Sequence, residues 1–149
     1  MSAKLSCLGL LIAGVLLASA SQANAGGYIF TDLGTLGGDN SSASAINDAG
    51  QVAGSAWTTG NTYLDSHATL WNGTTATDLG TQQIGYYDQS GSGAFAINNV
   101  GQLAGSSGGH AILWNGIMAT DLQGTLDGTY SVAAGINDAS YSQMLCTAA

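Results

Sequence analysis

The sequence predicts an all-β protein built from antiparallel four-stranded repeat units. These units resemble the blades of a β-propeller, but about two and a half of them are too few to close a ring. Two blocks recur: Ala45–Gly54 returns as Ala96–Gly105, and His67–Leu79 returns as His110–Leu122. The period of about 40–50 residues is in the range of propeller blades. Turn-forming Asn-Gly pairs between β-prone runs, and the lack of a sustained helical pattern, favour strands.

The first 25 residues are predicted to be a signal peptide. Lys4 gives a positive start, Leu5–Ala18 is apolar, and Ala23-Asn24-Ala25 fits cleavage before Gly26. The apolar run is shorter than the roughly 20 residues of a membrane-spanning helix, and no basic residue follows it. We therefore expect a secreted protein, extracellular or periplasmic, that is not inserted in a membrane after cleavage at Ala25-Gly26.

The remaining chain, 26–149, is expected to form one β-repeat domain. Its units are expected at approximately 27–41, 42–80, 93–123 and, in part, 131–139. The predicted strands are a lone one at Gly27–Leu33, four in the first full unit (Ser42–Asn47, Gln51–Ala56, His67–Trp71 and Thr74–Leu79), four more within 93–122, and one beginning near Ser131.

Two kinds of turn join the predicted strands. Asn72-Gly73 and Asn115-Gly116 are two-residue hairpin turns, because both positions tolerate a positive φ. The segment 47–50 suits a type I turn followed by a left-handed Gly50. After Ala139 the expected Gly-Gln-Val-x-Gly is replaced, which indicates a truncated copy of a longer protein. Its open sheet edges, at 27–33 or 131–137, would favour self-association.

These blocks resemble the HAF repeat of probable extracellular bacterial proteins. The resemblance rests on Thr31–Gly38 (Thr-Asp-Leu-Gly-Thr-Leu-Gly-Gly), on Ile46–Gly54 (Ile-Asn-Asp-Ala-Gly-Gln-Val-Ala-Gly) and on His110–Leu122, and it covers nearly all of 27–138. The family's phenylalanine position is Thr69 in one copy and Ile112 in the other. The resemblance implies an exported, propeller-like repeat protein without an assigned activity and with no catalytic residues to carry over.

The recurring polar and aromatic residues are interpreted as structural. His67 and His110 hold the same repeat position, so they should lie on neighbouring units and not converge, whereas a zinc site needs three or four ligands together. We expect each histidine to bond within its own unit, to a backbone or aspartate oxygen, and the tryptophans to pack between strands. The positions assigned this structural role are His67, Trp71, Asp78, His110, Trp114, Asp121, Asn47, Gly50, Asn98 and Gly101.

No catalytic, cofactor-binding or metal residue is predicted. The sequence has no Glu, and no Gly-x-Ser-x-Gly elbow stands with triad partners outside the repeat. Gly37–Asn40 resembles a Gly-Asp-rich calcium loop, but the tandem nine-residue pattern and the Asp-x-Asp-x-Asp-Gly loop are both missing. Calcium is thus the alternative to having no cofactor.

The net charge and the cysteine count limit the possible partners and functions of the protein. The net charge is −8 with one Lys and no Arg, which disfavours nucleic acid and anionic lipid as partners. After cleavage Cys146 is the single cysteine, so no internal disulfide can form. We expect a non-catalytic interaction or structural module of unknown ligand, with recognition in loops 57–66, 81–92 and 106–109. The alternative is a secreted hydrolase, or a calcium-stabilised binding protein, using a propeller funnel.

Overall fold

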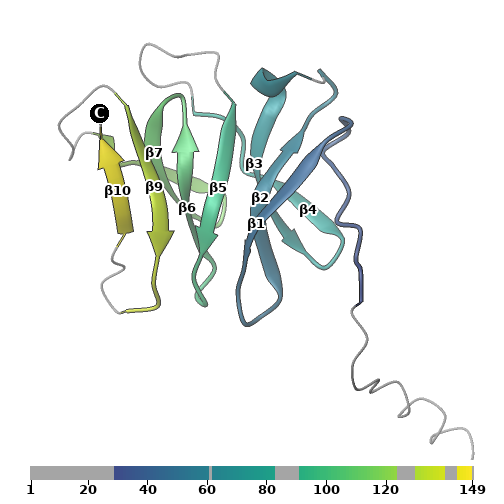
Figure 1. Ribbon diagram of the computed structural model, residues 1–149, viewed down its shortest axis with the longest axis horizontal. Coiled ribbons are helices and arrows are strands. Elements are labelled where there is room, and N and C mark those ends of the chain that lie inside the picture. The colour runs from purple at the N-terminus through teal and green to yellow at the C-terminus, as the bar shows by residue number, and fades with distance from the viewer. Residues whose placement is uncertain (1–28, 61, 83–90, 124–129, 140–143, 149) are drawn as a thin grey trace, which may run out of the picture. The chain divides into compact units, whose positions relative to one another are not determined.

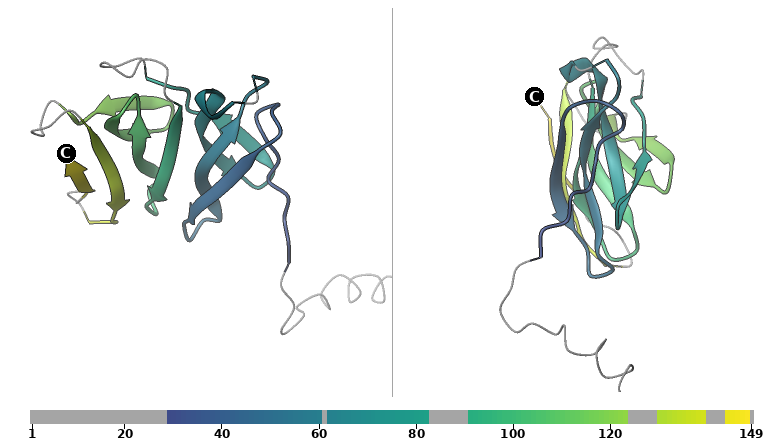
Figure 2. Two further views of the ribbon diagram at one scale, coloured as in Figure 1. Left: turned by 45° about the horizontal axis from the view of Figure 1, so that its top comes forward. Right: turned by 90° about the vertical axis from the view of Figure 1, so that its right-hand side faces the viewer.

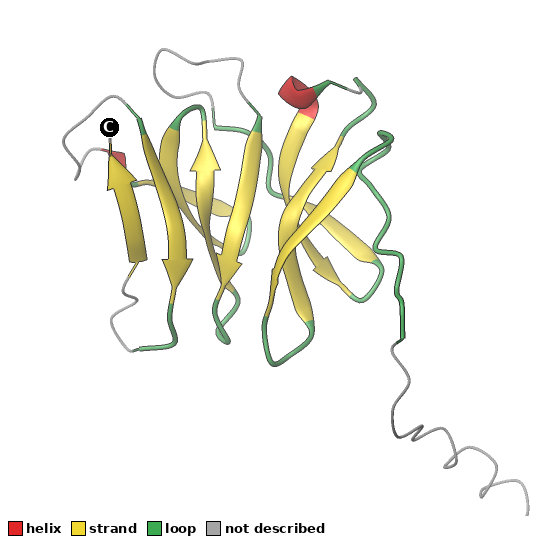
Figure 3. Cartoon of the chain, viewed as in Figure 1, coloured by secondary structure: helices red, strands yellow, loops and turns green. Residues whose placement is uncertain are grey.

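The computed structural model describes residues 29–60, 62–82, 91–123, 130–139 and 144–148. The chain divides into two units, Met1–Thr31 and Asp32–Ala149, and the account below concerns the second. Its described elements are β-strands and one short 3₁₀ turn, η1 (Tyr63–Asp65), and Gln123 also has 3₁₀ conformation (Figure 3). The all-β prediction is confirmed. The predicted signal peptide lies outside the described residues.

Two four-stranded antiparallel sheets and one two-stranded sheet follow one another along the chain (Figure 1). In each, the strands lie side by side in chain order, and neither four-stranded sheet closes into a barrel. The first sheet contains β1 (Ser41–Ile46), β2 (Gln51–Trp57), β3 (Ser66–Asn72) and β4 (Thr75–Asp78). The second contains β5 (Ser92–Ile97), β6 (Gln102–Ser107), β7 (His110–Asn115) and β8 (Met118–Asp121), and the third contains β9 (Ser131–Ile136) and β10 (Met144–Ala148).

The two full sheets have the same register, down to their irregularities. Val52 pairs with Trp71 in the first sheet, and Leu103 pairs with Trp114 in the second. The pairing of the first strand with the second shifts by a β-bulge at the same place in each, between Ala43 and Ala45 and between Ala94 and Ala96. A bulge bends the strand and increases its twist. The sequence repeat therefore encodes a repeat of local geometry.

The turns differ in one detail from the prediction. At 47–50 the amide of Gly50 donates to the carbonyl of Asn47, and Gly50 has a φ of +76°, as expected. At the two Asn-Gly hairpins, however, Asn72 pairs with Thr75 and Asn115 pairs with Met118. The two-residue loops are therefore Gly73-Thr74 and Gly116-Ile117, not Asn72-Gly73 and Asn115-Gly116. The physical reason is that Gly73, with a φ of +60°, takes the first central position, where a left-handed residue is needed.

The core lies between neighbouring sheets, which stand face to face like successive blades (Figure 2). The interface of the first two sheets buries Leu103, Ile112 and Trp114 against small residues of the first sheet, Ala53 and Ala68. Burying each of the three large side chains stabilises the fold by about 1.5–3 kcal/mol. The interface of the second and third sheets is built on smaller residues, Ala104, Ala111 and Ala133.

Two predictions about the ends of the repeat were wrong. The described part of the expected strand at 27–33, residues 29–33, is not a strand and takes part in none of the described ladders, and a β-prone run needs a ladder partner to become a strand. Instead the following segment joins the first sheet, where Gly38 N donates to Trp57 O and Trp57 N to Asn40 O. Conversely β10 was not anticipated, since its residues lack the repeated motif. It pairs with β9 in an antiparallel ladder.

Candidate functional site

The ends of β1, β5 and β9 border a shallow pocket of about 280 Å³, which we call the turn pocket. The turns that follow these strands lie at the lower edge of Figure 1. Each sheet contributes one Ile-Asn-Asp or Ile-Asn-Asn triplet to the lining: Ile46, Asn47 and Asp48; Ile97, Asn98 and Asn99; Ile136, Asn137 and Asp138. The pocket is at the opposite end of the strands from loops 57–66 and 106–109, where the sequence placed recognition.

Two buried amides hold the three turns together. Asn47 Nδ2 donates to Gln51 Oε1 (2.8 Å) in its own sheet and to Asn98 O (3.1 Å) in the next. Asn98 Nδ2 repeats this with Gln102 Oε1 (2.9 Å) and Asn137 O (3.2 Å). Asn47 is 8% and Asn98 4% exposed. Each side chain therefore fixes its own hairpin and the spacing to the next one.

A second row of bonds crosses the pocket at the surface. Asn99 Nδ2 donates to Asp48 Oδ2 (2.7 Å) on one side and to Asp138 Oδ2 (2.8 Å) on the other. The backbone follows the same path: Asp48 N donates to Asn99 Oδ1 (2.9 Å), and Asn99 N to Asp138 Oδ1 (2.6 Å). Asparagine in the middle unit supplies the donor, whereas a third aspartate there would place like charges together.

The two carboxylates of the turn pocket have no cationic side chain to neutralise them among the described residues. Both Asp48 and Asp138 are exposed, and the described residues contain neither Lys nor Arg. The pocket is therefore an acidic surface with a partly apolar wall, because the exposed Ile46 and the half-buried Ile97 and Ile136 line it as well.

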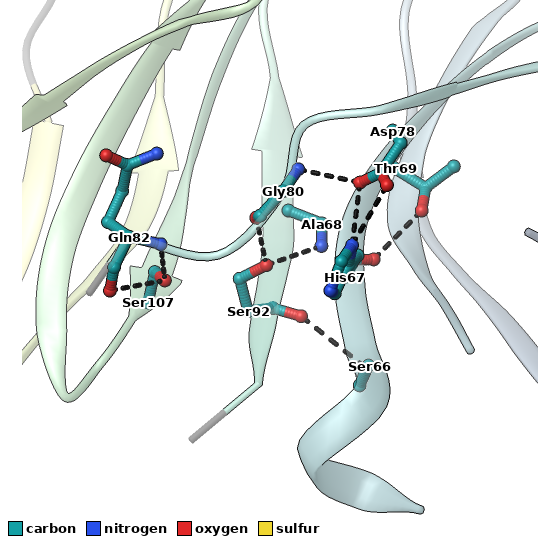
Figure 4. Close-up of polar contacts among 9 residues, drawn as sticks. All are labelled: Ser66, His67, Ala68, Thr69, Asp78, Gly80, Gln82, Ser92 and Ser107. Carbon is teal, nitrogen blue, oxygen red and sulfur yellow. Dashed lines mark hydrogen bonds and ion pairs between the residues drawn. The ribbon is translucent and has the colours of Figure 1, made fainter. Parts of the chain in front are cut away.

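The histidines bond within their own sheets and do not line the turn pocket. His67 Nδ1 lies 2.9 Å from Asp78 Oδ1 and 3.0 Å from Asp78 Oδ2 (Figure 4). His110 Nδ1 lies 3.0 Å from Asp121 Oδ2 in the second sheet. Asp78 also accepts from Gly80 N (2.7 Å), so one carboxylate braces both the outer strand and the turn after it.

Asp65, in the loop between β2 and β3, carries the clearest electrostatic perturbation. Its Oδ2 accepts hydrogen bonds from the Thr62 hydroxyl (2.6 Å) and the Thr62 amide (3.0 Å). These bonds favour the charged form and hold the pKa of the Asp65 carboxyl below its ordinary value, against a small opposing effect of desolvation. Such a carboxylate organises its own loop.

Serines at the start of the first strands connect neighbouring sheets, which the sequence analysis missed. Ser92 Oγ accepts from Ala68 N (2.7 Å) in β3 and donates to Gly80 O (2.5 Å), which lies just after β4 (Figure 4). Ser131 Oγ accepts from Ala111 N (2.9 Å) in the same way and bonds Gln123 Oε1. The available signal was Ser at the first position of both β5 and β9.

One serine stands in a pattern with the spacing of a hydrolase elbow. Gly105–Gly109 reads Gly-Ser-Ser-Gly-Gly, with Ser107 at its centre. However, Ser107 ends β6 and is 1% exposed, and its hydroxyl accepts from Gln82 N at 2.7 Å (Figure 4). A nucleophile elbow instead exposes its serine on a turn from strand to helix. The bonding of Ser107 is that of a structural group.

The remaining assigned positions lie in the packing and the turns. Trp71 and Trp114 are fully buried, and the indole Nε1 of each has no hydrogen-bond partner within the described structure. Gly101, like Gly50, has a positive φ, of +82°. The proposed calcium segment 37–40 is bonded to the end of β2. Within the described ranges, no group of three His, Cys, Asp or Glu side chains could hold a metal ion.

Two parts of the chain that the sequence analysis singled out, the loop 81–92 and Cys146, are described only in part. Residues 83–90 of the loop 81–92 lie outside the described part of the chain, and Cys146 is described only as a position in β10. No helix of the described residues has the length and hydropathy needed to cross a membrane.

Removing either histidine should lower stability only modestly. Because the His67–Asp78 and His110–Asp121 pairs are partly exposed, His67→Ala or His110→Ala should cost about 0.5–1 kcal/mol of unfolding free energy. His67→Asn, whose amide nitrogen can replace Nδ1, is the matched control and should lose less. Thermal unfolding followed by circular dichroism measures the loss, and elemental analysis should find the same metal content in all variants. Loss of a stoichiometric metal in either alanine variant would contradict the structural role.

Together, the sheets and the turn pocket define an antiparallel β-repeat protein in which neighbouring units share one acidic pocket. Comparisons with family models, with curated proteins and with solved structures found no match to this chain. The resemblance to the HAF repeat stays a prediction from the sequence.

Proposed function

We propose that the protein is an exported, non-catalytic β-repeat module that binds a partner in the turn pocket. One observation carries the proposal: the turns of three consecutive units meet in a single pocket whose two carboxylates are not neutralised by a described cationic side chain. Concave sites with convergent polar groups are the usual place for ligands.

The bonding of the other polar residues favours binding over catalysis. His67 and His110 each pair with an aspartate of their own sheet, and Ser92, Ser107 and Ser131 bond backbone or amide groups. A general base and its nucleophile should instead lie within reach of each other in a shared cleft. The same polar arrangement recurs on both full sheets, which suits a role in holding each unit together.

Export is the second part of the proposal and rests on the sequence of residues 1–25. Expressed with its own N-terminus, the protein should appear outside the cytoplasm and begin at Gly26, because the processing site follows Ala23-Asn24-Ala25. N-terminal sequencing checks this. Trypsin should leave the exported chain uncut, since it lacks Lys and Arg. A secreted species that retains Lys4 would contradict the signal peptide.

Ligand screening of the exported protein tests binding. The panel contains calcium, amines, short peptides, oligosaccharides and chromogenic hydrolase substrates, and the measurement is the shift in melting temperature. We expect at least one ligand to raise that temperature in the wild type and not in the double variant Asp48→Asn, Asp138→Asn. Turnover of a chromogenic substrate, or ligands that stabilise both forms equally, would overturn the proposal. Sedimentation of the same preparation reports the self-association that open sheet edges favour.

A further inference from the structure

We propose that the turn pocket binds the cationic side chain, arginine or lysine, of a partner protein. This inference rests on the proposed function and specifies its ligand. The first argument is the placement of the carboxylates. Asp48 Oδ2 and Asp138 Oδ2 both lie within 2.8 Å of the same nitrogen, Asn99 Nδ2, so the two negative charges are close neighbours.

The neutral amide between these charges bonds them but does not neutralise them. Because the two charges have the same sign, they repel each other. A cation that enters the pocket removes this repulsion and gains attraction to both carboxylates. Each carboxylate has lone pairs beyond those that Asn99 uses, because an ionised carboxylate accepts at about four sites.

The second argument is the apolar part of the pocket. Ile46 is 69% exposed, and Ile97 and Ile136 are half-buried on the same wall. Arginine and lysine carry a charged head on an aliphatic stem, and such stems bury well along apolar surface. A bare ammonium or metal ion would gain nothing from the isoleucines. The volume of about 280 Å³ is large enough to hold a single side chain.

The third argument is charge complementarity over the whole chain. The sequence carries a net charge of −8 with Lys4 as its single basic side chain, and Lys4 precedes the proposed cleavage site. The described residues therefore offer no cation to fill the pocket, and the overall field attracts basic partners and speeds their association.

Peptide titration followed by two-dimensional NMR tests this inference on the exported chain. The probes are one blocked pentapeptide of Gly and Ser with a central arginine, the same peptide with lysine, and the same with norleucine, which keeps the stem and lacks the charge. We expect the arginine and lysine peptides to shift the amide signals of Asp48, Asn99 and Asp138, with a Kd of roughly 1 mM that weakens as salt is added. The signal shifts caused by the norleucine peptide should not reach saturation during the titration.

Variants distinguish the effect of the two pocket carboxylates on peptide binding from the effect of the net charge of the chain. Asp48→Asn with Asp138→Asn should weaken the arginine peptide about tenfold or more. Asp48→Asn keeps an oxygen that can accept from Asn99 Nδ2, and Asp138→Asn keeps one of the two acceptors that Asn99 uses. Asp32→Asn is the control, because it removes one negative charge elsewhere and keeps the acceptor that Gly34 N uses. It should leave the affinity within about twofold. Ile46→Ser, which shortens the wall, should weaken binding without changing its salt dependence.

The outcomes distinguish this inference from the proposed function. If the norleucine and arginine peptides bind equally well, or if the double variant keeps its affinity for the arginine peptide, the inference that the pocket binds a cationic side chain is wrong. If the amide signals of the pocket shift only with calcium, or only with an oligosaccharide, the inference of a cationic side chain is wrong. The proposed function, that the pocket binds a partner, is then still supported. If no ligand class perturbs the pocket, both proposals fail.

Discussion

Replacing Gly105 with alanine is expected to unfold the second sheet or to destabilise it by about 3 kcal/mol, the upper end of the range for overpacking. A Cβ at this position would collide with the carbonyl oxygen of Gly93, and it would lie 2.9 Å from Ala94 Cα and 3.0 Å from the carbonyl carbon of Gly93. These are backbone atoms of the adjacent strand at the β-bulge, so they cannot move aside without breaking the ladder between β5 and β6.

A matched substitution in the neighbouring strand controls for the loss of glycine itself. A Cβ at Gly93 would meet only the ring of Phe95, at 3.3 Å, and that exposed ring can rotate away. Gly93→Ala should therefore change stability by less than about 0.5 kcal/mol. Urea unfolding followed by tryptophan fluorescence compares the two variants. If Gly105→Ala were as stable as Gly93→Ala, the close approach of the strands at the bulge would be disproved.

Exchanging Asn47 for aspartate is the second large effect, expected to cost about 3 kcal/mol at neutral pH. The change is nearly isosteric, but it replaces the donating Nδ2 by an oxygen that faces two acceptors, Gln51 Oε1 and Asn98 O. The new group is almost fully buried, since Asn47 is 8% exposed. Two hydrogen bonds are lost, and a charge is placed against two carbonyl oxygens.

The pH dependence of this variant has a defined sign. The amides of Ala49 and Gln51, which donate to Oδ1, favour the charged form, but burial and the two facing carbonyl oxygens disfavour it more strongly, so we expect a raised pKa of the new carboxyl in the folded state. The deficit relative to the wild type should therefore be largest at neutral pH and should shrink as the pH falls through that raised pKa, where the protonated group can donate again. Urea unfolding at neutral and mildly acid pH measures it.

Asn137→Asp provides the comparison, at the equivalent position of the third unit. Asn137 is exposed, and its Oδ1 accepts from Ala139 N, which a carboxylate oxygen does equally well. Because a charge at this exposed position stays hydrated, this variant should lose less stability than Asn47→Asp and show a weaker pH dependence. An equal loss in both variants would mean that the contact from Asn47 to the next sheet does not contribute to folding.

Much of the fold was predictable because its determinants are local and occur twice. The fixed spacing from Ile46 to Gly54 and from Ile97 to Gly105 encodes a hairpin in each copy, with Gly50 and Gly101 at the left-handed turn position. The prediction of strands failed where a neighbouring strand, and not the local sequence, determines whether a segment becomes a strand. A β-prone run such as 29–33 becomes a strand only beside another strand, and β10 is a strand because β9 lies beside it.

The candidate site was not predicted from the sequence: of the residues that line it, only Asn47 and Asn98 were singled out, and both as structural positions. Comparison of the repeats singled out Asn47 and Asn98 as recurring, yet it could not tell that their turns bond to each other across sheets. One signal was present and not used: the middle unit has Asn99 where its neighbours have Asp48 and Asp138. Such a departure inside a strict repeat indicates a contact between equivalent positions, because identical acidic residues would repel one another there.

The stacking of the sheets has a consequence for how stability is distributed along the chain. The inter-sheet contacts described above join units that follow one another in sequence, as the serine hydroxyls of β5 and β9 do with the preceding sheet. In such a linear array the free energy of unfolding is close to a sum of terms for single units and for each junction. The sheet β5–β8 takes part in both junctions, so damage to it uncouples its neighbours from each other. A destabilising substitution in β1–β4 leaves the contacts between the second and third sheets intact.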